Sequence, residues 1–354
     1  MLKAKVIAPV SADPVVEAAV DPLKRRGKDL RTKLGLSVEV ADRRTLAEID
    51  REARAGGVDL LIIATPWSET KEATVGMFEG LARHPGRPPV IYLDTFDQSS
   101  SPYFGVLPYV DAYVKKQLHR DLSDYDNDYV GGYILPDFCA RQYGLEVGDW
   151  HFGSPVPVEY RDRVHVGWNI GAWGEIAKRL FYPWKALDVT HRKRLDVVCR
   201  LSCGDTENYY QVHRKAALEA LAPLRDSGLD VVVEGYKRVP LRQFHAELRE
   251  SRIGFSPFGW GEVTDRDYHC VSGRTLLVKP SMEHLVTKPD IYVAGETYVP
   301  VKWDMSDAVE RCRHYLDRPA EIERITKNAL AMYLAYFEHD GFLTTIRELL
   351  DAVM

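Results

Sequence analysis

The sequence contains no apolar run long enough to span a bilayer. Its N-terminus also lacks the basic, apolar and small-residue segments that together make a secretory signal. These absences predict neither a membrane-spanning helix nor export from the cell. We therefore expect a cytoplasmic protein.

Cysteine is scarce as well. The 354 residues include five cysteines, an odd number, and they are scattered along the chain. Cys199 and Cys203 lie close together in the sequence, but no second pair of thiols accompanies them. This usage predicts neither a disulfide framework nor a zinc site.

The chain has no excess of basic charge. Its 47 Lys and Arg residues against 52 Asp and Glu residues give a formal net charge of -5 at pH 7. Such a balance provides no general attraction to nucleic acid or to an anionic membrane, so neither is indicated as a partner. A length of 354 residues suffices for two domains, each with its own core.

Apolar runs and helical patterns alternate through the first half of the chain. Because this alternation is typical of parallel sheets with right-handed crossovers, it predicts a Rossmann-like α/β domain with ligands beyond the carboxyl ends of the strands. The expected strands are 3–9, 38–41, 58–65, 90–94 and 110–114, and the expected helices run from 14 towards 34, from 45 to 55 and from 69 to 83. Residues 121–150, rich in Tyr, Asp and Gly, predict an irregular excursion that could shape an acceptor site.

The loop after the fourth expected strand reads DTFDQSSSPYFG and carries two carboxylates, Asp94 and Asp97. A turn needs few of these polar groups, so both aspartates are candidates for chemistry. The alternative is that they cap turns and satisfy nearby backbone amides, as Asp and Ser often do. Lys115 and Lys116 follow the fifth strand, and we expect them to face water rather than the cleft.

The alternation of strands and helices restarts after a linker near residues 155–190. The linker contains Trp168, Trp173 and Trp184, which we expect in a core. Strands are expected at 195–199 and 230–234 and a helix at 209–224, which predicts a second Rossmann-like domain. After Ser306, an expected N-cap, the chain reads as mainly helical, with a break near Asp340.

Residues 252–280 form the most informative stretch, with the order strand, loop, helix and strand. Gly259 and Gly261 open a loop, and Thr264 with Asp267 has the spacing of a capping box. Gly273 fits a left-handed residue just past the helix end. A helix N-terminus beyond strand ends commonly binds phosphate, although an ordinary βαβ unit has the same pattern.

Basic side chains accompany this stretch. Arg266 and Lys279 lie within it, and Arg200 follows the first strand of the second domain, where a guanidinium would reach a ligand above the sheet edge. The alternative for Arg200 is a surface ion pair with Asp205 or Glu207.

The segments GWGE, RDYH, LLVKPSMEHL and KPDIY resemble the donor-domain signature of GT-B glycosyltransferases, most closely the CgeB-like and exostosin-like groups. The resemblance covers about a tenth of the chain. It implies two Rossmann-like domains that face each other across a cleft, with a helical C-terminus. The implied boundaries are 1–165 for the acceptor domain, 166–335 for the nucleotide-sugar donor domain, and 336–354 for a final helix that packs back on the first domain.

The resemblance implies a glycosyltransferase that moves a sugar from a nucleotide-sugar to a hydroxyl of a glycan, polysaccharide or small acceptor. Neither a metal nor a further cofactor is expected. His269 stands where the family carries a hydroxyl-binding glutamate, and Glu262 and Asp267 are carboxylates that could substitute for it. The implied donor-binding residues are Arg200, Gly259, Gly261, Glu262, Arg266, Asp267, His269 and Lys279, and the implied base is Asp94 or Asp97.

Two alternatives remain open at this stage. The same architecture also occurs in sugar-nucleotide epimerases and polyol-phosphate transferases. A protein that binds a nucleotide without turnover is compatible with histidine at position 269.

Overall fold

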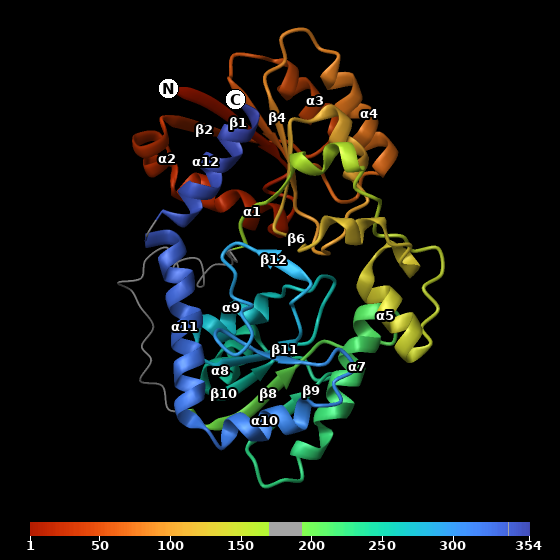
Figure 1. The fold of residues 1–354 in the computed structure, drawn as a ribbon, viewed down its shortest axis with the longest axis vertical. Helices are drawn as coiled ribbons and strands as arrows, with labels where there is room; N and C mark the ends of the chain where they lie inside the picture. The colour runs from red at the N-terminus through yellow and green to blue at the C-terminus, as the bar shows by residue number, and fades with distance from the viewer. Residues whose placement is uncertain (170–192, 339) are drawn as a thin grey trace.

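The chain folds into two α/β domains, each built on its own parallel sheet (Figure 1). A computed structural model describes residues 1–169, 193–338 and 340–354. The first sheet has the order β2-β1-β3-β4-β5-β7, and the second has the order β13-β11-β10-β8-β9. The expected fold class, two Rossmann-like domains with a helical C-terminus, is confirmed.

The first domain contains the predicted alternation. Strands β3 and β4 are buried apolar runs, as expected where helices cover both faces of a parallel sheet. Thr45 and Glu48 form a capping box at the start of α3, and Asp13 caps α1. The strands are Leu2–Ala8 (β1), Leu36–Asp42 (β2), Leu60–Ile63 (β3), Val90–Asp94 (β4), Ala112–Lys115 (β5) and Val164–Val166 (β7), and the helices are Pro14–Arg25 (α1), Gly27–Leu34 (α2), Leu46–Arg54 (α3) and Lys71–Ala82 (α4).

The second domain repeats the architecture. Its core packs the apolar faces of β8, β10 and β11 against α7 and α10. The stretch 252–280 supplies its third and fourth strands in chain order, β10 and β11. The strands are Leu195–Arg200 (β8), Val231–Glu234 (β9), Ser251–Phe255 (β10), Leu276–Pro280 (β11) and Val299–Val301 (β13), and the helices are Tyr209–Leu221 (α7), Leu241–Glu250 (α8), Asp265–Ser272 (α9), Ala308–Leu316 (α10) and Pro319–Glu338 (α11).

Two local predictions about helix ends are wrong. Gly273 has a φ of -87°, and the left-handed residue is Arg274, with a φ of 50°. A Cβ at Gly273 would lie 3.0 Å from the carbonyl oxygen of His269, so close approach explains this glycine. Helix α10 has Asp307, not Ser306, at its N-cap.

The excursion at 121–150 is less irregular than expected, because it contains helix α5 (Ile134–Tyr143). This helix lies beside α7 of the second domain in Figure 1, and the thiol of Cys139 donates to the carbonyl oxygen of Tyr209. A segment that precedes the linker therefore packs on the far domain. Trp168 is buried against Phe342, in a core as expected, while Trp173 and Trp184 lie outside the described residues.

Three further features join the domains. Strand β6 (Gln117–His119) pairs antiparallel with β12 (Leu285–Thr287). Helix α12 (Gly341–Val353) returns to the first domain, where Asp340 pairs with Lys33 (Figure 1). The Gly261 loop also presses directly on the first domain, since a Cβ at Gly261 would lie 1.8 Å from the carbonyl oxygen of Asp97.

The close approach at Gly261 yields a prediction. Gly261→Ala should lower the free energy of unfolding by about 1–3 kcal/mol, because backbone from both domains must move to admit the methyl group. Gly76→Ala is the matched control: no atom lies within 4 Å of its added Cβ inside α4, so it should be neutral or stabilising by up to about 1 kcal/mol. Urea unfolding of both variants checks this, and equal stability for Gly261→Ala and the wild type would contradict it.

Candidate functional site

A cavity of about 250 Å³ lies between the two domains, beyond the carboxyl ends of both sheets. This is where open parallel sheets commonly bind ligands. The first domain contributes Val15, Ala18, Ala19, Leu93, Asp94, Thr95, Asp97, Val114, Lys116, Trp168 and Asn169, and the second contributes Arg214, Gly259, Trp260, Gly261, Val263, Thr264, Asp265 and Tyr268.

The start of α9 forms the polar wall of the cavity. Thr264 and Asp267 make the predicted capping box, and the loop before it is closed by a hydrogen bond from Gly259 N to Gly261 O of 3.0 Å. The N-terminus of α9 therefore carries its partial positive charge towards the cavity.

Arg214, on α7, adds a full positive charge to this wall, which also contains the carboxylate of Asp265. Its Nη1 donates to Ser202 O at 2.9 Å, its guanidinium lies 4.9 Å from the ring centre of Tyr210, and its Nε has no hydrogen-bond partner among the described residues. Burial and the nearby charge of Arg266 lower the pKa of Arg214. A cation held under these conditions favours an anionic ligand.

Arg266 is a second guanidinium near Arg214, but it is buried and is not among the residues that line the cavity. It is 7% exposed, its Nη1 donates to Ser256 Oγ at 3.2 Å, and its Nε has no partner in the described part of the chain. Within residues 1–169, 193–338 and 340–354, neither Arg214 nor Arg266 pairs with a carboxylate. Sequence reasoning missed Arg214; the available signal was its position one helical turn after Tyr210.

The other two predicted cations are engaged elsewhere. Arg200 forms a two-point ion pair with Glu247, with distances of 2.5 and 3.0 Å, so the expected alternative partners Asp205 and Glu207 are wrong. Lys279 is fully buried, and its Nζ lies 3.1 Å from Asp267 Oδ2. Asp267 also accepts from Tyr292 OH at 2.8 Å and thereby fixes the start of α9. The cavity lining includes none of Arg200, Asp267 and Lys279.

His269 is not among the residues that line the cavity. Its ring packs on His245 of α8, with ring centres 3.9 Å apart, and edge-on to Phe244 at 6.2 Å. The ring of His269 therefore packs on helix α8. That His269 binds a hydroxyl of the nucleotide-sugar stays a prediction.

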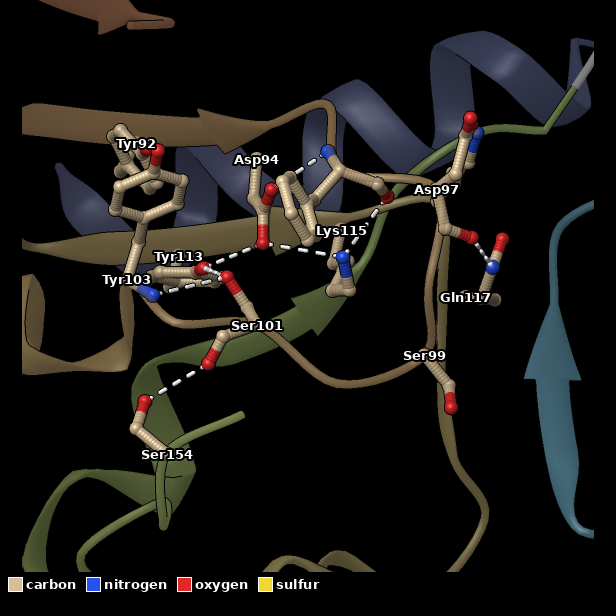
Figure 2. A network of polar contacts seen from close by, with 12 residues as sticks. Tyr92, Asp94, Asp97, Ser99, Ser101, Tyr103, Tyr113, Lys115, Gln117 and Ser154 are labelled. Carbon is tan, nitrogen blue, oxygen red and sulfur yellow. Dashed lines mark hydrogen bonds and ion pairs between the residues drawn. The ribbon is translucent and has the colours of Figure 1, made fainter. Parts of the chain in front are cut away.

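Asp94 is held in a buried network at the end of β4 (Figure 2). Its Oδ1 accepts from Phe96 N at 2.8 Å, and its Oδ2 accepts from Tyr113 OH at 2.5 Å and from Lys115 Nζ at 3.2 Å. The expectation that Lys115 faces water is wrong: it is fully buried, and burial lowers its pKa while Asp94 opposes that effect. Both oxygens of Asp94 are therefore occupied.

Asp97 is more accessible. It lies on the far side of the same loop from Asp94 in Figure 2, its side chain is 37% exposed, and its Oδ1 accepts from Lys116 Nζ at 2.5 Å. One carboxylate oxygen thus remains for a ligand. Asp97 and Lys116 both line the cavity.

Glu262 is fully buried between the domains, where it joins the second domain to Ser99 of the first. Its Oε1 accepts from Ser99 Oγ at 2.6 Å, and its Oε2 accepts from Ser99 N at 3.1 Å. Burial alone would raise the pKa of Glu262, but the imidazole of His284 and the hydrogen bonds from Ser99 outweigh it and lower the pKa to about 2. Glu262 is therefore an ionised link between domains.

His119 lies next to this link. Its Nε2 is 3.4 Å from Ser99 Oγ, and the side chain is 2% exposed. Burial lowers the pKa of His119 to about 4, so the imidazole is neutral near pH 7.

Comparisons with known proteins agree with this architecture. No protein-family model matches the chain, and no curated protein matches it by sequence. Among solved structures, an alpha-glucosyltransferase in complex with UDP and a 13-mer DNA containing a HMU base is 12% identical, with a TM-score of 0.54 over 99% of each chain. An alpha,alpha-trehalose-phosphate synthase (UDP-forming) from Burkholderia vietnamiensis is 12% identical, with a TM-score of 0.53 over 99% of this chain and 100% of that one. At these identities the likeness establishes a shared two-domain fold.

The two neighbouring lysines provide a matched test of the buried network. Lys115→Met should cost about 3–5 kcal/mol of unfolding free energy, because it leaves the Asp94 carboxylate buried without its cation. Lys116→Met removes a half-exposed pair and should cost at most about 1 kcal/mol. Denaturant unfolding at pH 7 measures both, and equal losses would contradict the description of the network.

His119 predicts an acid-sensitive contribution to stability. Its pKa falls from the usual 6.5 to about 4, so the folded protein resists a proton that the unfolded chain accepts. This contribution to the free energy of unfolding is complete above pH 6.5 and is lost as the pH falls through 4. The total loss is about 3 kcal/mol. His119→Gln should flatten this part of the stability curve, measured by urea unfolding between pH 7 and 4. The same slope in variant and wild type would show that His119 titrates normally in the fold.

Proposed function

We propose that this chain is a glycosyltransferase that moves a sugar from a nucleotide-sugar donor to a hydroxyl acceptor. The observation that supports it most directly is Arg214, a guanidinium without a carboxylate partner in the described residues, which lines the cavity beside the N-terminus of α9, with the buried charge of Arg266 nearby. A diphosphate matches this arrangement in charge and in hydrogen-bond acceptors. In the shared-fold structures one enzyme holds UDP and the other is UDP-forming, which makes UDP the first probe.

The chemistry follows from the charges on the two walls. Cleavage of the bond between sugar and diphosphate builds negative charge on the leaving group, and Arg214 with the α9 N-terminus would stabilise that charge without further rearrangement. Asp97 would accept the acceptor proton, because it lines the cavity and keeps an oxygen available, while both oxygens of Asp94 accept from the protein. Asp94 would then position the loop that carries Asp97.

We also propose that no metal is needed, since the positive wall can neutralise the diphosphate itself. Within the described residues no three His, Cys, Asp or Glu side chains are grouped to hold a metal ion, and no helix there is long and apolar enough to cross a membrane. A closer affiliation with the CgeB-like or exostosin-like groups remains part of the proposal.

Turnover of nucleotide-sugars tests the reaction type. The purified protein is incubated with a panel of nucleotide-sugars, with and without hydroxyl acceptors, and with and without a chelator. Release of nucleoside diphosphate together with a glycosylated acceptor is expected. Interconversion of the sugar without release would indicate an epimerase, and binding without turnover would indicate a nucleotide-binding protein; either result overturns the proposal.

Arg214 carries the sharpest prediction for the donor site. Arg214→Ala should weaken UDP binding by about 1.5–3 kcal/mol, roughly 10- to 150-fold in Kd, because a charge-assisted contact to the diphosphate is lost. Arg313→Ala, an exposed position on α10, is the matched control and should bind like the wild type. Calorimetric titration with UDP measures all of these proteins. If Arg200→Ala lost more UDP affinity than Arg214→Ala, the diphosphate would bind at Arg200, as the sequence alone had suggested, and the assignment to Arg214 would be wrong.

A further inference from the structure

We propose that the acceptor is a small uncharged molecule that carries its hydroxyl on an apolar ring or chain, and that it binds the first-domain wall of the cavity. This inference rests on the proposed function, which needs a hydroxyl acceptor opposite the donor. Hydroxyl acceptors in general include glycans, sugar phosphates and nucleic acids. The inference limits the acceptor of this protein to one kind of molecule.

Helix α1 supplies an apolar face to this wall. Val15, Ala18 and Ala19 have the spacing i, i+3 and i+4, so they share one face of α1, and all three are partly exposed. Leu93, Val114 and Trp168 complete the lining from β4, β5 and the segment after β7, but they are themselves buried, so the exposed apolar part of the wall is the face of α1. An apolar ligand is stabilised on such a surface because binding removes apolar area of both the protein and the ligand from water.

The charges on this wall cancel. Asp97 pairs with Lys116 at 2.5 Å, and Asp94 pairs with Lys115 at 3.2 Å, so each carboxylate has its own cation. An anionic acceptor would need a cation free of such a partner. Arg214, which lines the cavity without a carboxylate partner among the described residues, belongs to the other domain and is taken by the donor diphosphate.

Besides the two ion pairs and Thr95, the wall carries a buried amide that could orient a hydroxyl. Asn169 lines the cavity and is 4% exposed; its Oδ1 accepts from Tyr268 OH, while its Nδ2 has no partner among the described residues. A single buried donor suits one hydroxyl on an otherwise apolar molecule. A glycan, with hydroxyls on every ring, would leave most of them unpaired against α1.

Acceptor competition tests the inference directly. Release of UDP from the best nucleotide-sugar is followed with no acceptor, with 2-phenylethanol, with cyclohexanol, with maltose and with glucose 6-phosphate. We expect the two apolar alcohols to raise UDP release at least tenfold and to be glycosylated, while maltose and glucose 6-phosphate change it less than twofold. Preferential transfer to maltose or to glucose 6-phosphate, or no effect of either alcohol, would overturn the inference.

A matched pair of variants locates the acceptor. Ala18→Asp places a charge on the apolar face of α1 and should raise the KM of the apolar alcohol at least tenfold, while the Kd of UDP stays within twofold. Ala47→Asp makes the same change at an exposed position of α3 and should alter neither constant. An unchanged acceptor KM in Ala18→Asp would overturn the location.

The experiment separates the two levels of the proposal. A protein that binds no UDP and releases none from any nucleotide-sugar contradicts the glycosyltransferase function, and the acceptor inference falls with it. A protein that transfers sugar, but to charged or polyhydroxylated acceptors, keeps the function and contradicts only the inference.

Discussion

The cleft depends on one buried carboxylate. Glu262 comes from the loop that precedes α9, yet both of its oxygens accept hydrogen bonds from Ser99 of the other domain. A buried carboxylate raises the free energy of the fold unless it is paired and hydrogen-bonded. Moving the loop away from the first domain would break the hydrogen bonds that compensate the buried charge of Glu262. Gly261 reinforces the constraint, because only a residue without Cβ fits against Asp97 O at this distance. The geometry of the polar wall is therefore set by contact with the opposite domain.

This constraint divides the charged residues of the site into two groups. Glu262, Asp94, Lys115, Asp267 and Lys279 have partners within the protein, and they hold the loop, the strand ends and α9 in place. Arg214 and Arg266 have no carboxylate partner in the described residues. A nucleotide diphosphate that binds between the domains would meet a rigid positive surface. Because this surface is ordered before binding, little entropy is lost, and it stabilises the negative charge that develops on the diphosphate during the reaction.

Sequence patterns predicted the fold well because its determinants are local. The alternation of apolar runs with capped helices identified both domains, and the spacing of Thr264 and Asp267 gave the start of α9. Site residues were harder to predict because their partners are distant in sequence. Arg200 meets Glu247, and His269 meets His245, each through tertiary packing. Lys115 was misjudged because its partner, Asp94, lies directly opposite on the neighbouring strand, in a register that only the sheet order reveals.

The most direct test of this account is a crystal structure of the protein with UDP. We expect the diphosphate between the domains, with its oxygens against the backbone amides at the start of α9 and the guanidinium of Arg214, and with Glu262 still bonded to Ser99. A diphosphate bound at Arg200, or a complex in which the Glu262 loop leaves the first domain, would contradict the account.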